Sequence, residues 1–428
     1  MAGVKVRFKM NNNEIRTDYI NLTLILSFAT LCIAQTFHVS SVIYFLIDIP
    51  IILMVTFKIK KFIKTLLCKS VYSITAILLF IVMAMTVGGV INGVSLGNAI
   101  YGAYKYFRGF VFFYCVLAFG DSKSVKQTLK IFNCIFWINI VLTLIEFFLL
   151  GINQDLLGGI FGLVMGVNQY TNLYFVIISV YCIEKIVCHD AEGSEYKRIL
   201  IISVLMLAVA ALAEIKFFFA EFVLLFMVAY LCLPQKPQTF FGVALILICV
   251  IVFYNLLIRM FPEFSTLIGE LRRGGLARLI DLQKHYSTDY DIGRAAVFSY
   301  SNKYLLPNRW NRLFGMGIGN VTSSNFVDNS FWLKNQGTHY DQFYTSYLYN
   351  EQGMIGFLLY CLIYVELLKI GIKSLFFTRT RKYGTMLIMM VTESIMIFIY
   401  NMAMYSQLSF IIFWALAVLV RKCTNSFS

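Results

Sequence analysis

Long and nearly uncharged apolar runs recur along most of the chain, and short polar segments separate them. Each run has close to the ~20 residues that a helix needs to cross the hydrocarbon core of a bilayer. Because backbone groups in hydrocarbon must be hydrogen-bonded within the segment, we expect the runs to be helices. The pattern predicts an all-α polytopic membrane protein with a single transmembrane domain over residues 1–428. Twelve transmembrane helices are expected, at residues 19–37, 40–57, 71–90, 102–119, 131–150, 170–188, 199–213, 217–233, 240–258, 345–367, 384–401 and 407–420.

Basic residues mark one side of this predicted bundle. Lysines gather after the second run and before the fifth run, and Arg421 and Lys422 follow the last one. The short loops between these basic segments contain almost no lysine or arginine. Cytoplasmic loops carry the excess of basic residues in membrane proteins, so both termini are predicted to lie in the cytoplasm. This alternation also favours an even number of spans.

One long segment, residues 259–344, breaks the apolar pattern. It is rich in Pro, Gly, Asn and Ser, and it has no run long enough to cross a bilayer. The predicted orientation places it outside the cytoplasm as a large loop between nine helices over 19–258 and three over 345–420. Long loops with aromatic residues commonly carry function and have structure of their own. We expect short helices here, for instance at 266–284 and 292–305.

Composition excludes a soluble protein. Hydrophobic residues make up 59% of the chain and charged residues only 14%, whereas a soluble domain has about 25% charged residues. The net charge of +14 would suggest a nucleic-acid partner in a soluble chain, but most of the basic residues lie in loops between the runs. No nucleic-acid partner is therefore expected. The ten cysteines are scattered and form no CxxC pair, so neither a disulfide framework nor a cysteine metal site is predicted.

Cationic side chains are the strongest candidates for binding. The large loop contains Arg272, Arg273, Arg278, Arg294, Arg309 and Arg312. A planar guanidinium donates paired hydrogen bonds to phosphate oxygens, so the group as a whole favours an anionic ligand, although any one arginine can pair with an aspartate or a lipid headgroup. Lys105, Arg108 and Lys216 lie near the ends of their predicted spans that face the side of the large loop. Ionisable groups at membrane depth are functional candidates, and the alternatives are snorkelling and, for Lys216, an ion pair with Glu214.

The segment that re-enters the membrane carries a candidate general base. His339 lies two residues before Asp341, and an unperturbed histidine titrates near working pH. A histidine in such a place is also often a hydrogen-bonded loop residue. Asp289 and Asp291 have the DxD form of metal-dependent sugar transferases. We interpret this as coincidence, because nucleotide sugars are not supplied outside the cytoplasm, and we expect neither a metal nor a cofactor.

The order of these parts resembles the O-antigen polymerase and ligase superfamily, which has many spans, a large outer loop late in the chain and a few spans after it. Arg294 followed by Leu313-Phe-Gly-Met-Gly-Ile-Gly-Asn320 looks like the family's Arg…GxGxGN segment. His339-Tyr-Asp341, followed by Asn350-Glu-Gln-Gly353-Met-Ile-Gly356, looks like its His-x-Asp…Glu-x-Gly-x-x-Gly segment. Two positions depart from the pattern: Lys216 stands where relatives commonly carry arginine, and His339 lies farther from the Glu-x-Gly segment.

The resemblance implies a glycosyltransferase that polymerises oligosaccharide repeat units held on undecaprenyl diphosphate. It would act on the outer face of the bacterial inner membrane, with membrane lipids and a chain-length regulator protein as partners. Arg294 would stabilise the charge on the departing diphosphate, and His339 with Asp341 would accept the proton of the acceptor hydroxyl. Support for diphosphate binding would come from Arg108, Lys216, Arg272 and Arg273. Two alternatives stay open: an O-antigen ligase that passes polymer to a lipid A core, and a flippase for lipid-linked oligosaccharides.

Overall fold

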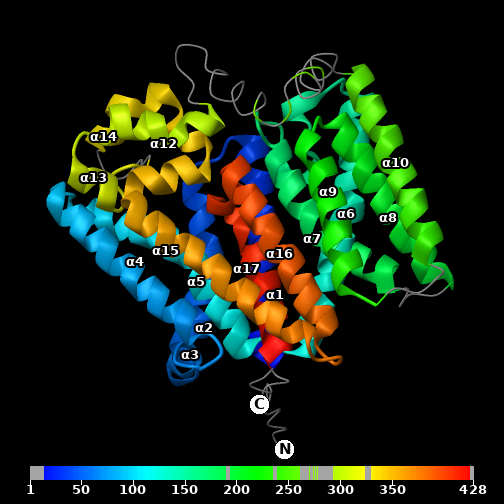
Figure 1. Ribbon diagram of the computed structural model, residues 1–428, viewed down its shortest axis with the longest axis horizontal. Helices are drawn as coiled ribbons and strands as arrows, with labels where there is room; N and C mark the ends of the chain where they lie inside the picture. Colours follow the sequence, from blue (N-terminus) through cyan, green and yellow to red (C-terminus); the bar gives the residue numbers. More distant parts are fainter. Residues whose placement is uncertain are drawn as a thin grey trace, which may run out of the picture.

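The computed structural model describes residues 14–188, 193–234, 239–260, 293–322 and 329–424, together with the single residues 269, 273, 275 and 277. The described chain is helical and contains no β-strand (Figure 1). The predicted all-α polytopic membrane architecture is therefore confirmed. The main helices are α1 (Glu14–Phe37), α2 (Asp48–Phe57), α3 (Ile59–Leu66), α4 (Tyr72–Ile91), α5 (Leu96–Phe119), α6 (Ser122–Phe148), α7 (Asn168–Cys188), α8 (Gly193–Leu212), α9 (Lys216–Cys232), α10 (Thr239–Met260), α15 (Tyr344–Leu375), α16 (Arg381–Tyr400) and α17 (Phe410–Thr424).

Fewer helices qualify as membrane spans than the twelve predicted. Among the described residues, seven helices are long and apolar enough to cross a bilayer, within α1, α4, α6, α7, α15 and α16 and over Gln407–Thr424. An eighth is reached if Ser41–Phe57 and Ile59–Leu66, which are bent by 92°, form one broken span. The other predicted spans coincide with α5, α8, α9 and α10. Helix α5 falls short because it carries Lys105 and Arg108, α8 because it begins with charged residues, and α9 because it has 17 residues. Of α10, the apolar stretch found among the described residues is Ile246–Arg259.

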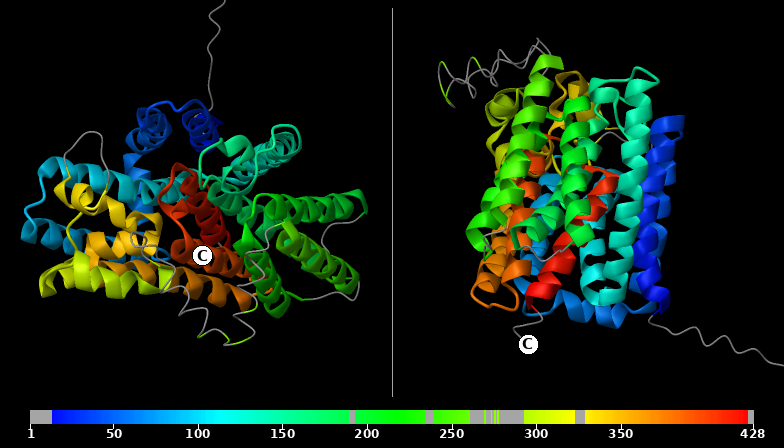
Figure 2. Two further views of the ribbon diagram at one scale, coloured as in Figure 1. Left: turned by 90° about the horizontal axis from the view of Figure 1, so that it is seen from above. Right: turned by 90° about the vertical axis from the view of Figure 1, so that its right-hand side faces the viewer.

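The helices form one bundle with α17 near its middle and α1 at its edge (Figure 2). Helices α4, α5 and α15 lie on one side, and α6 to α10 lie on the other (Figures 1 and 2). Helix α1 begins and α17 ends at the same end of the bundle, and the short helices α12 (Val297–Tyr300), α13 (Arg309–Phe314) and α14 (Ser330–Asn335) lie at the opposite end. We call the end with α12 to α14 the loop end. Segments from the whole length of the chain therefore meet there.

The described part of the large loop is folded into short helices. A 3-10 turn, η4 (Arg294–Ala296), leads through α12 into η5 (Ser301–Leu305), where a helix was expected at 292–305. Two further turns, η6 (Gln336–Thr338) and η7 (Tyr340–Gln342), precede α15. The helix expected at 266–284 lies outside the described residues except for four single positions.

Three glycines allow the backbone of the loop to pack closely against the helices of the bundle. Gly319 has a φ of +78°, and a Cβ at this position would overlap the carbonyl oxygen of Asn98 on α5. A Cβ on Gly102 would in turn overlap the backbone of Gly319. Gly353 kinks α15 with a φ of 65° and a ψ of −169°, and its bare Cα lies against the Leu313 backbone. We call Gly102, Gly319 and Gly353 the glycine junction. The glycine run in the sequence is thus explained by close backbone packing.

Candidate functional site

The centre of the candidate site is a break in the helical chain between α16 and α17. Residues 401–409 contain only two short turns, η8 (Ala403–Tyr405) and η9 (Gln407–Ser409). Asn401 holds the break in place, because its side-chain oxygen accepts a hydrogen bond from the Ala403 N–H at 2.8 Å and its carbonyl accepts one from the Tyr344 N–H at 3.2 Å. Irregular backbone at membrane depth is tolerated where it is buried in protein or lines a polar cavity. Aromatic residues in and beside this break contact three basic side chains, and a fourth interacts electrostatically with Tyr400.

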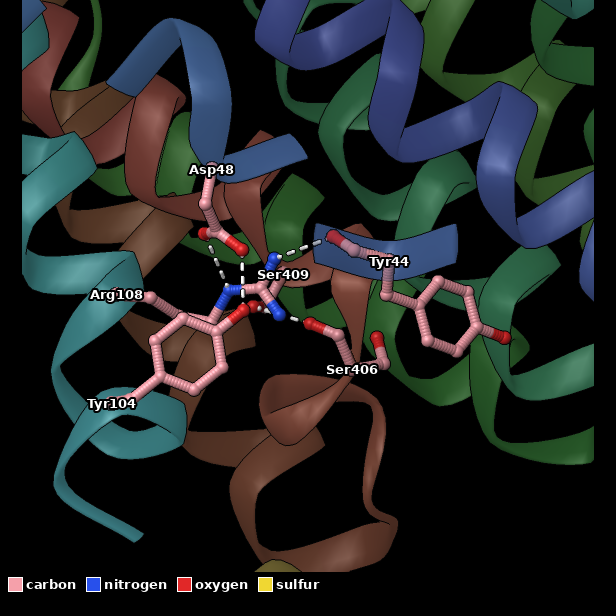
Figure 3. Close-up of polar contacts among 6 residues, drawn as sticks. All are labelled: Tyr44, Asp48, Tyr104, Arg108, Ser406 and Ser409. Atoms are coloured by element: carbon pink, nitrogen blue, oxygen red, sulfur yellow. Dashed lines mark hydrogen bonds and ion pairs between the residues drawn. The ribbon is translucent and has the colours of Figure 1, made fainter. Parts of the chain in front are cut away.

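Arg108 on α5 approaches the break beside Phe410. Its guanidinium lies 4.9 Å from the Phe410 ring centroid, and its Nε is 3.2 Å from Asp48 Oδ1 (Figure 3). The Tyr44 carbonyl accepts a hydrogen bond from Arg108 at 3.4 Å, and the Tyr104 hydroxyl donates to the second oxygen of Asp48. Both charged side chains are largely buried, and a buried ion pair is stable only when further hydrogen bonds satisfy its atoms. The Arg108 guanidinium is therefore fixed in position by these contacts, and Asp48 partly neutralises its charge.

Lys105 lies one helical turn before Arg108 and has a different environment. Its ammonium is 5.1 Å from the ring centroids of both Tyr101 and Tyr405, in the geometry of cation–π contacts. Within the described part of the chain, no carboxylate lies at ion-pair distance from it. Tyr405 connects it to a carboxylate indirectly, because the Tyr405 and Tyr347 hydroxyls are 2.9 Å apart and Tyr347 donates to Glu351 at 3.1 Å.

Arg294 reaches the other side of the break from η4. Its Nε donates a hydrogen bond to the Tyr400 carbonyl at 3.2 Å, and its guanidinium lies 4.4 Å from the Tyr400 ring centroid and 4.8 Å from that of Phe343. These contacts fix the plane of the guanidinium and leave its terminal nitrogens without a carboxylate partner among the described residues. An arginine held in this way is suited to binding an anion through two parallel hydrogen bonds.

Lys216 is the fourth basic residue near the break, and its neighbour Phe217 packs on the Tyr400 ring. The Phe217 ring stacks on the Tyr400 ring with centroids 4.3 Å apart and planes 4° apart, and Lys216 is the residue before Phe217. Its ammonium pairs with Glu214 at 2.5 Å, as the sequence alternative expected. We call Lys105, Arg108, Lys216 and Arg294 the basic cluster. Three of its four members were singled out as site residues from the sequence, and they come from three segments that are far apart in the chain.

The candidate base residues lie beside the basic cluster along the chain. His339 is exposed, has a left-handed φ of 51°, and its Nδ1 is 3.1 Å from the Gln342 amide nitrogen. Asp341 accepts a hydrogen bond from the Trp332 ring N–H at 3.4 Å. Between them, Tyr340 is buried and donates to the Val321 carbonyl at 2.6 Å, and burial raises the pKa of the Tyr340 phenol. Phe343, which follows this segment directly, is the residue that contacts Arg294.

The remaining predicted residues are placed only in part. Arg272 lies outside the described residues, and so do Asp289 and Asp291. Arg273 is described as one exposed position. Within the described ranges, no three His, Cys, Asp or Glu side chains gather to form a metal site. Metal independence and the roles of the two loop arginines stay predictions.

Two carboxylates of the site were missed by the sequence reasoning. Glu351 is fully buried, and its Oε1 accepts a hydrogen bond from the Gly319 N–H at 2.7 Å. It belongs to the Glu-x-Gly segment noted above, which was interpreted only as part of a motif. Asp48, the partner of Arg108, lies in the second predicted span. A lone aspartate in an apolar run was the available signal, because such a residue needs a cationic partner.

The arrangement places four cations around one break, and two of them have a carboxylate of the described chain within ion-pair distance. Such a cluster can hold an anionic group and stabilise negative charge that develops on it. No protein-family model matches the chain, and no curated protein matches it in sequence. The resemblance to the O-antigen polymerase and ligase superfamily therefore rests on the order of the motifs in this sequence.

Proposed function

We propose that the protein is a membrane glycosyltransferase that polymerises undecaprenyl-diphosphate-linked oligosaccharide repeat units into O-antigen or a related surface polysaccharide. The observation that carries this proposal is the basic cluster at the break between α16 and α17. A lipid diphosphate is a membrane-borne anion, and the unmatched donors of Arg294 and Lys105 provide the charge that such a group requires. Apolar surfaces between the helices would hold the polyprenyl chains.

The proposed reaction needs two kinds of group. A hydroxyl of the acceptor sugar attacks the anomeric carbon of the donor, the new glycosidic bond forms, and the bond from that carbon to the diphosphate oxygen breaks. The lipid diphosphate leaves with the electron pair, so Arg294 and its basic neighbours stabilise the negative charge on it without a metal. The proton of the acceptor hydroxyl goes to His339, with Asp341 orienting the imidazole or taking its place.

The proposal includes a topology. All twelve predicted helices cross the inner membrane, α5, α8, α9 and α10 among them, and both termini lie in the cytoplasm. Residues 259–344 and the basic cluster then face the outside, where lipid-linked repeat units are assembled into polymer. Reporter fusions at Ser70, Asp121 and Thr378 should report cytoplasm, and fusions at Leu96, Asn153 and Asn302 should report the outside. An outside signal at Thr378 would overturn this orientation.

Deletion of the gene, followed by gel electrophoresis of surface polysaccharide, tests the proposed activity. A single repeat unit on each lipid A core is expected, and expression of the wild-type chain should restore the long polymer. Bare core with retained lipid-linked polymer would instead indicate an O-antigen ligase. Loss of both products would indicate a flippase for lipid-linked oligosaccharides. An unchanged polysaccharide ladder would contradict all three functions.

A further inference from the structure

Two glutamates lie enclosed between α9 and α16, away from the basic cluster. Glu221 on α9 is 0% exposed and Glu393 on α16 is 1% exposed. The two helices pack against each other, and the carboxylates are close enough to interact electrostatically. Among the described residues, none of the four buried carboxylate oxygens has a hydrogen bond of good geometry. Buried polar groups in native proteins are almost always hydrogen-bonded, so this pair requires an explanation.

The pair lies below the loop end of the bundle, inside the helical region. Glu221 is five residues after Lys216, the first residue of α9, which corresponds to about 7.5 Å along the helix. Glu393 is seven residues before Tyr400, the last residue of α16, which corresponds to about 10 Å. Both carboxylates are therefore at a similar depth, roughly two helical turns from the basic cluster.

The basic side chains nearest along these helices are engaged elsewhere. Lys216 pairs with Glu214, and Lys382 at the opposite end of α16 pairs with Glu184 at 2.6 Å. Arg294 stacks on Tyr400 beyond the end of the helix. Among the described titratable groups, Tyr400 at the end of α16 interacts electrostatically with Glu221.

Two uncompensated negative charges at this position are not stable. Burial of one ionised carboxylate costs several kcal/mol, and two carboxylates that share a site repel each other. The charge must therefore be balanced by something other than a basic side chain.

A third polar group points to what balances it. Asn172 on α7 is 2% exposed and lies next to the Glu221 carboxylate. Its amide oxygen is also buried without a hydrogen-bond partner. Three oxygen-bearing side chains from α7, α9 and α16 thus meet in an enclosed place. The Asn172 side chain interacts with Glu221 there, and the buried acceptor atoms have no hydrogen bond of good geometry in the described chain. Oxygen atoms of this kind bind hard cations and protons.

We propose that Glu221, Glu393 and Asn172 form an intramembrane binding site for a monovalent cation, either a proton or Na⁺. A proton bound to one carboxylate would satisfy the pair through a hydrogen bond between the two acids. A Na⁺ ion would be coordinated by the carboxylate oxygens and the Asn172 amide oxygen. A proton removes the repulsion by neutralising one acid, and a Na⁺ ion offsets it by lying between the two charges. Either occupant connects α7, α9 and α16 below the basic cluster. This site is separate from the proposed glycosyl transfer and does not depend on it.

Infrared difference spectroscopy of the purified full-length protein in lipid vesicles tests the proposal. If a proton is bound, the spectrum at neutral pH contains a carbonyl band of a protonated carboxylic acid that disappears as the pH is raised. If Na⁺ is bound, replacement of choline by Na⁺ at constant pH and ionic strength shifts the carboxylate stretching bands. Either signal must be lost from the variant Glu221→Gln/Glu393→Gln. The absence of both signals, or their persistence in this variant, would overturn the proposal.

Two controls keep the experiment decisive. Glu366→Gln removes a carboxylate on α15 that is paired with Lys369 at 2.6 Å, and it should leave both signals unchanged. If the double variant does not fold, each single glutamine variant is measured instead. Loss of the signal from both single variants supports a shared site, whereas an unchanged signal in both contradicts it. None of these readouts measures glycosyl transfer, so failure of the proposed function would leave the result intact.

Discussion

The glycine junction and the basic cluster lie at the same end of the bundle and share α5, yet their contacts differ. At the glycine junction, backbone lies against backbone, and the Gly319 N–H donates to Glu351 at 2.7 Å. At the basic cluster, long side chains lie against aromatic rings, and Arg294 and Lys105 have no carboxylate within ion-pair distance in the described chain. The first region is complete without a ligand and the second is not. The glycine junction therefore holds the loop in position on the bundle, and the basic cluster provides the side chains that would bind an anion.

The largest expected effect is on folding, from a side chain placed in the glycine junction. Gly319→Ala combines a left-handed φ of +78° with an overlap between the new Cβ and the Asn98 backbone. We expect a loss of stability of about 4 kcal/mol or more, measured as the yield of monodisperse protein and the midpoint of thermal unfolding. Gly151→Ala is the matched control, because Gly151 also has a left-handed φ, of +68°, with nothing within 4 Å of the added Cβ. Its expected cost is about 1–2 kcal/mol. Equal stability of the two variants would contradict the role of the junction.

The next largest effect is expected on the rate of glycosyl transfer, when the candidate base His339 is replaced. His339→Ala should leave folding and lipid-diphosphate binding unchanged and should slow glycosyl transfer by about 10²–10⁴-fold, the usual cost of a lost general base. Transfer rates are measured with Asp341→Asn in parallel. A normal rate for His339→Ala with a collapsed rate for Asp341→Asn would assign the base to Asp341. Normal rates for both would show that the segment is structural.

Much of the fold was predictable because it depends on local pattern. Each of the twelve predicted ranges overlaps a helix, and the gap between the predicted spans 199–213 and 217–233 is a turn in which Glu214 has a φ of 55°. The bend of 92° at Lys58 was not predictable. Neither the apolar run before it nor the basic segment after it fixes an angle, which depends on tertiary packing.

The sequence predicted most residues of the candidate site but not their arrangement in space. Arg108, Lys216 and Arg294 were identified because charged groups near or within apolar helices need a reason to be there. Their convergence on the break at 401–409 depends on contacts between segments that are about a hundred residues apart or more, and a single sequence does not reveal such contacts. The pairing of Arg108 with Asp48 was missed for the same reason.

A smaller effect is expected from changing the donor geometry of the basic cluster. Arg294→Lys keeps the positive charge and loses the forked pair of donors. This change should weaken transfer by about 1.5–3 kcal/mol, the range for a hydrogen bond to a charged group. Arg309→Lys, on the exposed first turn of α13, is the matched control and should have no effect. The comparison between the two regions fails if both arginine variants retain the wild-type rate.

The smallest expected effect is an increase in the affinity for undecaprenyl diphosphate. Glu214→Gln removes the carboxylate that pairs with Lys216 and keeps the shape of the side chain. Because Lys216 no longer has a competing anion, the affinity for undecaprenyl diphosphate should rise by up to about fivefold, the limit set by a partly exposed ion pair. The dissociation constant of the purified protein in detergent is the measurement. Weaker binding would show that Glu214 supports the ligand site.

Chain elongation by the reconstituted protein is the decisive measurement for the assignment of the basic cluster as a diphosphate site. Wild-type protein and Arg294→Ala, at equal amounts in liposomes with a chelator present, are incubated with undecaprenyl-diphosphate-linked repeat units, and the lengths of the lipid-linked products are measured. We expect products of many repeats from the wild type and little elongation from Arg294→Ala. Absence of elongation by the wild type, or equal products from both proteins, would contradict the assignment of the basic cluster as the diphosphate site of a polymerase.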